Sequence, residues 1–298
     1  MSNKYLAYAT ANDDRAYVKY FLNFINMCVH NPGVEHIHLF VAISAVRPFD
    51  DKDLQAITRL LAIFDGCSWI TVQNVVLKGN VGRDFSSAYV CLKSIATHAS
   101  DNDVVMVKNR SGYGPLESGW FLAYEKQLVS DRTVGLVGST INFSGHPKVQ
   151  AAGIATHIQT YVYVSLWKYF AQIVDMFPAI KCTDRLSLIA EGEIGLSRIF
   201  MEHGLALSCL AWPNHSFTLA IPADISLPQH DIKRKVRTVP IRYKYKSYGR
   251  WRYVSPFWWK YWVKSRFSVL SNDLPIVYSS RFGDVGPTVT STFSNVGY

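Results

Sequence analysis

The sequence predicts an α/β fold in which helices flank a mostly parallel β-sheet. In roughly the first hundred residues, short apolar segments alternate with segments of helical periodicity, which is typical of consecutive βαβ units. The chain has 298 residues, 49% of them hydrophobic and 18% charged, so it can bury a large core as one domain or as one domain with an appendage. Right-handed crossovers would place the loops that follow the strands along one edge of the sheet.

Four strands and three helices are expected in order in this first part. The strands are short apolar runs, and the helices between them carry apolar residues at intervals of three or four. The second helix begins with aspartates and ends at Gly66. The expected strands are KYLAYATA (4–11), HIHLFVAI (36–43), SWITVQNVVL (68–77) and VVMVK (104–108), and the expected helices lie within 14–31, 51–66 and 85–99.

The pattern is looser after Trp120. A helix with acids in its first turn is expected from AEGEIGLSRIFMEHGL, because carboxylates at that end favour the helix dipole. The expected elements are strand-like segments at 134–143 and 151–166, this helix at 190–205, a last strand at 206–212 and a Pro-bounded linker at 213–231.

These segments divide the chain into a main domain over 1–222 and a basic, aromatic extension over 223–298. The last residues, 282–298, are rich in Gly, Ser and Thr, and we expect them to be poorly ordered.

The net charge of +9 is concentrated in the extension. Twelve basic residues and no acid lie between Ile232 and Phe267, which leaves the rest of the chain at −3. Aromatic rings packed on the main domain with cations in water are the favoured interpretation. An anchor to an anionic membrane surface through 232–267 comes second, and a platform for nucleic acid comes last.

Composition also limits the cellular setting. The sequence shows no basic segment followed by a long apolar run, and no stretch of 18 uncharged apolar residues. The five cysteines lack paired spacing, so neither a zinc site nor a disulfide framework is expected. We therefore expect a cytoplasmic protein, with attachment to the periphery of a membrane as the alternative.

The loop NVGRD precedes the third expected helix. Gly82 lets the backbone approach a ligand, and the helix N-terminus offers N–H groups to an anion. Arg83 adds a bidentate phosphate donor, and Asp84 can accept from a sugar hydroxyl. The alternative is an ordinary loop in which Asp84 is the helix N-cap.

The loop KNRSGYGP follows the fourth strand, at the edge where open α/β sheets bind ligands. Lys108, Asn109, Arg110 and Ser111 could hold a diphosphate there. The alternative is a Gly/Pro turn with solvated cations.

Two later segments carry groups that can transfer protons. Glu191 and Glu193 lie at the expected helix start, and His157, Gln159 and Tyr161 share one face of an extended segment. A carboxylate in a cleft can remove a proton from a hydroxyl, although such acids usually serve only the helix dipole. A single histidine is more often structural than catalytic.

In this order, the motifs resemble the rhamnan synthesis protein F family of glycosyltransferases, which has relatives among the sugar transferases of large algal viruses. The resemblance rests on Asn-x-Gly-Arg-Asp, Asn-x-Ser-x-x-Gly-Pro, His-x-Gln-x-Tyr and Glu-x-x-Leu-Ser, and it runs from about Tyr5 to Trp212. It implies a GT-A-type fold, a UDP-, GDP- or dTDP-sugar donor, and a glycan or lipid-linked glycan acceptor. The family name favours rhamnose, with another deoxy or neutral hexose or a pentose as alternatives.

The resemblance also implies roles for individual residues. Glu193, three residues before Leu196, would be the catalytic base, and His157 would lie on the acceptor side. Gln159, Tyr161 and Glu191 would complete the acceptor side. The donor would contact residues after the first strand and in the two loops, namely Thr10, Asn12, Asn80, Gly82, Arg83, Asp84, Lys108, Asn109, Arg110 and Ser111.

One departure from the family concerns the metal. The usual Asp-x-Asp position reads Asn109-Arg110-Ser111, which leaves the need for Mn²⁺ or Mg²⁺ open. Asp101-Asn102-Asp103 spells the motif but precedes its strand, so we interpret it as a turn at the opposite edge.

We hypothesise that Lys108 and Arg110, with Arg83, neutralise the donor diphosphate in place of part or all of the metal charge. The rival hypotheses are a catalytically inactive sugar-binding relative and a protein that binds nucleic acid or a membrane surface through its extension.

Overall fold

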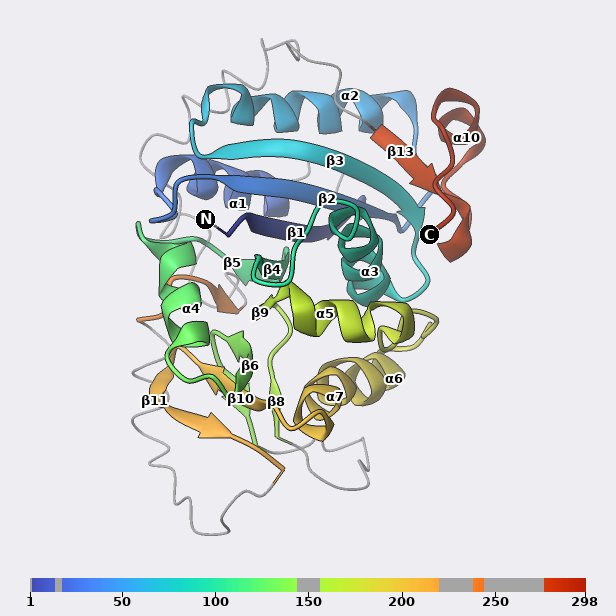
Figure 1. Cartoon of the computed structure of the whole chain (residues 1–298). Coiled ribbons are helices and arrows are strands. Elements are labelled where there is room, and N and C mark those ends of the chain that lie inside the picture. Colours follow the sequence, from blue (N-terminus) through green and yellow to red (C-terminus); the bar gives the residue numbers. More distant parts are fainter. Residues whose placement is uncertain (1, 14–17, 144–155, 220–237, 244–275) are drawn as a thin grey trace.

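The computed structural model describes residues 2–13, 18–143, 156–219, 238–243 and 276–298. Its main feature is a sheet with the strand order β11-β10-β6-β9-β4-β1-β2-β3-β13 (Figure 1). Most pairings in it are parallel, which confirms the predicted α/β class. The strands are β1 (Lys4–Ala11), β2 (Ile37–Ala45), β3 (Ile70–Gly79), β4 (Val104–Asn109), β6 (Val134–Gly138), β9 (Val162–Leu166), β10 (Ala206–Cys209), β11 (Trp212–Phe217) and β13 (Ile276–Ser279).

Helices cover both faces of this sheet. Alternate residues of a strand point to opposite faces, so Leu6 and Tyr8 of β1 enter one hydrophobic cluster, and Tyr5 and Ala7 enter the other. The first cluster packs under α1 (Val18–Val29), α2 (Asp51–Leu61) and α4 (Trp120–Val129). The second packs under α3 (Arg83–Ile95), α5 (Trp167–Ile173) and α7 (Gly195–Glu202).

Strand β9 interrupts the parallel order. It lies between β4 and β6 and runs antiparallel to both. The edge strand β11 is also antiparallel, and it contains residues expected to begin a linker. That expectation is wrong for 213–217, because these residues form part of a strand with β10. The short pairs are β5 (Gly112–Tyr113) with β12 (Arg242–Tyr243), and β7 (Ile141–Asn142) with β8 (His157–Ile158).

The acids Glu191 and Glu193 do not lie in a first helical turn, as the sequence had predicted. The helical stretch begins earlier, with α6 (Arg185–Ser187), whose N-cap Asp184 accepts from two backbone N–H groups. It continues as the π-helix η3 (Leu188–Ile194), which contains both glutamates, and then as α7. A π-turn inserts an extra residue and changes the direction of the side chains that follow.

The C-terminal residues are ordered, so the expectation of poor order over 282–298 is wrong. β13 pairs with β3 in parallel, and the short helices η6 (Ser280–Phe282) and α10 (Pro287–Thr292) follow it beside the end of β3 (Figure 1). The Phe282 carbonyl accepts from the Val81 N–H at 3.2 Å, so this segment supports the loop after β3. The proposed domain boundary near residue 222 lies outside the described residues, as does most of 232–267.

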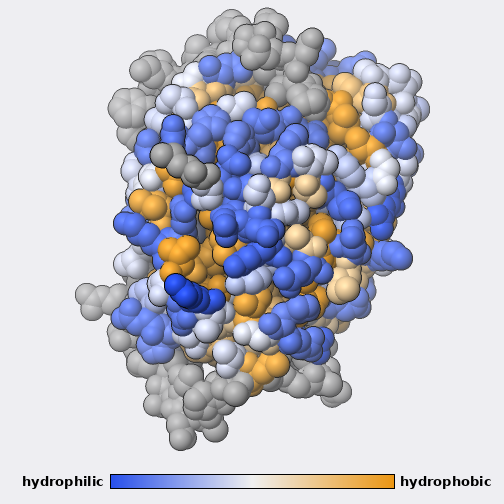
Figure 2. All heavy atoms as spheres, viewed as in Figure 1, coloured by the Kyte–Doolittle hydropathy of each residue, from blue (hydrophilic) through white to orange (hydrophobic). Residues whose placement is uncertain are grey.

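The face of the molecule in Figure 2 is mixed in polarity, and the cysteines, which all lie in the described residues, form no disulfide. Hydrophilic and hydrophobic residues are interspersed on the face shown in Figure 2. In the part of the chain that the structure describes, no helix has the length and apolar character needed to cross a membrane. The five cysteines are free thiols, and Cys28, Cys91 and Cys209 are buried.

Candidate functional site

A cleft of about 440 Å³ opens at the carboxyl ends of β1, β2, β3 and β4. This is the edge at which open α/β sheets bind ligands, and the volume suits a small molecule. The cleft brings together seven of the ten residues predicted to bind the donor, namely Thr10, Asn80, Arg83, Asp84, Asn109, Arg110 and Ser111.

The loop before α3 holds Arg83 in the cleft. Gly82 is the N-cap of α3 with φ 70°, and its N–H donates to the Cys182 carbonyl at 2.9 Å. A Cβ at Gly82 would overlap the carbonyl of Ile180, so glycine is required there by both conformation and space. Arg83 also has a positive φ of 45°, and its exposed guanidinium makes no hydrogen bond or ion pair with the described residues. Asp84 is therefore not the helix N-cap.

Asp84 and Asn109 connect α3 to β4 across the cleft. The Asn109 Nδ2 donates to Asp84 Oδ2 at 2.7 Å, and Asn109 Oδ1 accepts from the Ser111 N–H at 2.9 Å. Burial raises the pKa of the Asp84 carboxyl, and the hydrogen bond from Asn109 opposes that shift. The pair thus fixes two polar groups at the centre of the site.

Arg110 is matched by a carboxylate that sequence reasoning missed. Its guanidinium forms a bidentate ion pair with Asp13, and its Nη1 also donates to the Ala11 carbonyl at 3.2 Å. Asp13 stands just after β1, at the same edge as the loop that follows β4, and this position was the available signal. Arg110 therefore lines the cleft with its charge already compensated.

Lys108 does not line the cleft, and its predicted role in a diphosphate clamp stays a prediction. It points to the opposite face of β4 from Asn109, because side chains alternate along a strand. Its Nζ is fully buried, donates to the Gly112 carbonyl at 2.5 Å and lies 4.9 Å from the centre of the Tyr8 ring. Burial holds the pKa of Lys108 well below its usual value.

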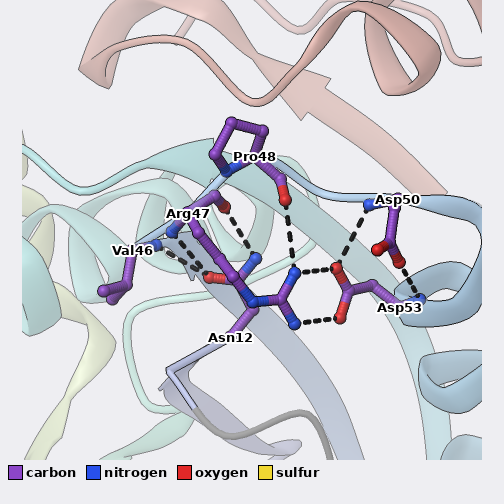
Figure 3. A network of polar contacts seen from close by, with 6 residues as sticks. All are labelled: Asn12, Val46, Arg47, Pro48, Asp50 and Asp53. Atoms are coloured by element: carbon purple, nitrogen blue, oxygen red, sulfur yellow. Dashed lines mark hydrogen bonds and ion pairs between the residues drawn. The ribbon is translucent and has the colours of Figure 1, made fainter.

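Asn12 is also placed away from the ligand side, in the network drawn in Figure 3. Its Oδ1 accepts from the Val46 N–H at 2.8 Å, and its Nδ2 donates to the Arg47 carbonyl at 2.8 Å. Arg47 in turn forms a bidentate pair with Asp53 of α2 at 2.5 and 2.6 Å. Asn12 therefore shapes the loop after β2, from which Val46 enters the cleft.

Thr10 contributes a polar atom that is buried beside the cleft. Its Oγ1 has no hydrogen-bond partner among the described residues, although the side chain is only 4% exposed. Buried hydroxyls are normally paired, so an unpaired one at a cleft indicates a place for a ligand or a water molecule. Ser44 and Val46, at the end of β2, also line the cleft and were not predicted.

The predicted catalytic pair is adjacent to the cleft but does not line it. His157 Nε2 lies 4.0 Å from Glu193 Oε2, and the histidine is buried whereas the Glu193 side chain is 33% exposed. Burial, followed by the charge of Asp84, raises the pKa of Glu193 to about 7. Asp84, which contributes to this shift, itself lines the cleft.

The three residues predicted to complete the acceptor side do not line the cleft. The Thr140 Oγ1 donates to Gln159 Oε1 at 2.7 Å and lies 3.0 Å from the Tyr161 hydroxyl. Glu191 accepts from the Cys182 thiol at 3.2 Å, and this contact helps raise the pKa of the thiol to about 11, after burial. Their predicted roles in acceptor binding stay predictions.

The described residues do not form a metal-binding set. No group of three or more His, Cys, Asp and Glu side chains among them is placed to hold an ion. Asp103, in the Asp-x-Asp at the opposite edge, accepts from the backbone N–H groups of Asn3 and Ser100 at 2.7 and 2.8 Å. Its carboxylate therefore serves the turn before β4.

Comparison with known proteins does not place the chain in a family. No family model matches it, and no curated protein matches it. A crystal structure of 4-diphosphocytidyl-2C-methyl-D-erythritol synthase shares 12% identity over 79% of this chain and 99% of the enzyme, with a TM-score of 0.35. A Drosophila β1,4-galactosyltransferase 7 mutant, in complex with manganese, UDP-Gal and xylobiose, shares 12% identity over 67% of this chain and 79% of the enzyme, with a TM-score of 0.28. Both scores are too low to inform the function of this chain, and the resemblance to the rhamnan synthesis protein F family stays a hypothesis.

Proposed function

We propose that this protein is a GT-A-like glycosyltransferase that transfers a sugar from a nucleotide-sugar donor to an acceptor hydroxyl. The observation that carries the proposal is the meeting of seven predicted donor-binding residues in one cleft at the carboxyl edge of the sheet. These residues come from three separate parts of the sequence, and no helix or strand carries all of them. Parallel strands bring such loops to one edge in any fold of this class, so the support lies in what the loops carry there: an unpaired guanidinium on Arg83 and an unpaired buried hydroxyl on Thr10, both at the ligand-binding edge.

The charges and polar groups that line the cleft suggest the orientation of the donor in this proposal. The diphosphate lies against Arg83 and the N-terminus of α3, where a free guanidinium and the positive end of the helix dipole meet. The nucleoside lies toward the ends of β1 and β2, where Thr10 offers an unpaired hydroxyl and Val46 an exposed apolar wall. Asp84 and Asn109 face the sugar.

The chemistry requires a base for the acceptor hydroxyl, and Glu193 takes this role in the proposal. A carboxylate with a pKa near the working pH is partly ionised and still basic enough to accept a proton. His157, whose Nε2 lies 4.0 Å from this carboxylate, is its neighbour on the acceptor side in the proposal. Rhamnose as the sugar and a lipid-linked glycan as the acceptor belong to this proposal through the motif resemblance alone.

A binding screen tests the proposal. The melting temperature of the protein is measured with UDP-glucose, GDP-mannose and dTDP-rhamnose, each with and without Mn²⁺, because a ligand that binds only the folded state raises it. At least one donor should raise the melting temperature, and its sugar should be hydrolysed or transferred. The Mn²⁺ arms report whether a metal contributes.

Arg83→Ala is the matched variant, with Arg59→Ala as its control. Arg59 is an exposed arginine of α2, away from the cleft. Loss of charge-assisted hydrogen bonds of about 1.5–3 kcal/mol should weaken donor binding roughly 10- to 150-fold in the first variant and leave it unchanged in the second. The proposal is wrong if no donor stabilises the protein, or if both variants bind like the wild type.

A further inference from the structure

A second lysine, Lys78, lies buried beneath the cleft. It is the residue before the last of β3, and its side chain is fully buried. Its Nζ donates to Ser44 Oγ at 2.9 Å and to the Gly79 carbonyl at 2.7 Å. Ser44 itself lines the cleft, so its hydroxyl group would lie between Lys78 and a ligand bound there.

The charged groups around Lys78 include Arg281 of η6, whose guanidinium lies 5.6 Å from the centre of the Phe282 ring. In register, Lys78 lies between Ser44 of β2 and Ser279 of β13, and the Phe282 ring lies 5.5 Å from its Nζ. Among the described residues, no carboxylate is within ion-pair distance of this Nζ, and the titratable groups that act on it are Asp84 and Cys91, both of α3. Burial lowers the pKa of Lys78 to about 7, and the charge of Asp84 opposes this shift.

The charges on the walls of the cleft determine how much the protonation of Lys78 changes the net charge that a ligand meets. Arg83 and Arg110 are balanced by Asp13 and Asp84, so the walls carry no net charge when all four groups are ionised. The state of Lys78 therefore decides whether the cleft as a whole is neutral or positive. A dianionic ligand would favour the positive state, because charges are weakly screened where water is excluded.

We propose that Lys78 is a positioning residue for the donor and that it takes up a proton when the diphosphate of a nucleotide-sugar enters the cleft. The neutral amine accepts one proton from solvent and becomes an ammonium, which orients Ser44 by donating to its Oγ. The hydroxyl hydrogen of Ser44 is then free to point to the ligand or to Ser87, whose Oγ is 3.1 Å away. This inference rests on the proposed function.

Calorimetry measures the proton directly. The best-binding of UDP-glucose, GDP-mannose and dTDP-rhamnose is titrated at pH 7.0 and pH 8.5 in two buffers that differ in ionisation enthalpy. These diphosphate diesters do not titrate near neutral pH, so proton uptake reports the protein. At a pH equal to its pKa, half of Lys78 is neutral, and uptake of up to about half a proton is expected at pH 7.0.

Three variants test which residue takes up the proton. Lys78→Met gives an unbranched, uncharged side chain that is one atom shorter. It should abolish most of the uptake, weaken binding about tenfold at pH 7.0 and remove most of its pH dependence. Glu193→Gln tests the other group that titrates near pH 7, and it should keep the uptake. Lys52→Met, an exposed lysine of α2, should behave like the wild type.

The outcomes separate the two proposals. If the wild type binds none of the donors, the proposed function and this inference both fall. If the wild type binds and a folded Lys78→Met variant shows the same uptake and affinity, only the inference falls. Should Lys78→Met fail to fold, Ser44→Ala replaces it. The Ser44 hydroxyl connects Lys78 to the ligand, so the inference requires that the loss of this hydroxyl weaken binding.

Discussion

The buried charge of Lys78 should destabilise the folded protein in a pH-dependent way. The pKa of this lysine falls from 10.5 to about 7 on folding, so between these values the unfolded state binds more protons than the folded state. Stability therefore rises with pH across this window, by up to about 1.4 kcal/mol per pH unit for one proton. Below pH 7 both states are protonated, and the full cost of the buried ammonium is present.

The change Lys78→Met removes this dependence. With the two pKa values above, the cost of keeping Lys78 in the folded state is about 4 kcal/mol at pH 7 and about 2 kcal/mol at pH 9. The free energy of unfolding of the wild type, relative to the variant, should thus increase by about 2 kcal/mol from pH 7 to pH 9. The lost hydrogen bonds to Ser44 and Gly79 shift both values equally, so the difference between the two pH values isolates the ionisation.

Urea denaturation of both proteins at pH 6.5, 7.0, 8.0 and 9.0 measures this difference. All other titrating groups are common to the two proteins and cancel in the comparison, apart from those that Lys78 itself affects. Lys52→Met serves as the control and should track the wild type at every pH. A difference between wild type and Lys78→Met that stays flat from pH 7 to pH 9 would refute the reasoning.

Three further predictions concern the loops and the base. Gly82→Ala should destabilise the fold by about 2–3 kcal/mol in urea denaturation, because a Cβ at this position meets a carbonyl. Gly204 has a similar φ but open space around it, so Gly204→Ala should cost only about 1 kcal/mol. Equal losses in the two variants would contradict the steric argument. Glu193→Gln should lower kcat by at least about 100-fold and remove a limb of the pH–rate profile that rises through about pH 7, and an unchanged profile would exclude Glu193 as base. Asp13→Asn should free the guanidinium of Arg110 and tighten donor binding about tenfold by calorimetry, and weaker binding would show that Asp13 itself holds the donor.

The parallel half of the sheet could be predicted from local patterns. The strand expected at 4–11 is β1, and those expected at 36–43, 68–77 and 104–108 are β2, β3 and β4 within about two residues at each end. Parallel strands joined by helices also place their following loops at one edge, and for this reason the residues after β1, β3 and β4 meet in the cleft. Local periodicity and the direction of the chain are sufficient to predict these strands and the edge at which their loops meet.

What could not be predicted depends on contacts between distant parts of the chain. The antiparallel strand β9 and the edge strand β13 owe their places to partners far away in sequence. The apolar run of β13 is only three residues long, and Gly/Ser/Thr-rich residues follow it. The π-turn that carries Glu193 could not be predicted, because no particular amino-acid composition marks such a turn. Lys108 is different, because alternation along β4 places it on the face opposite Asn109, and that signal was available.

The pairing of Arg110 with Asp13 changes how the charge of a donor can be met. Of the three cations expected to neutralise the diphosphate, one is buried on the face of β4 opposite Asn109 and one is already paired, so Arg83 alone remains unpaired within the described part of the cleft. One guanidinium and a helix N-terminus supply less positive charge than a dianion carries. The remainder has to come from protonation of Lys78, from release of Arg110 or from a cation that enters with the donor. These sources leave different signatures, namely proton uptake, a response to Asp13→Asn and a response to Mn²⁺, and donor binding that showed none of the three would mean that the diphosphate does not lie in this cleft.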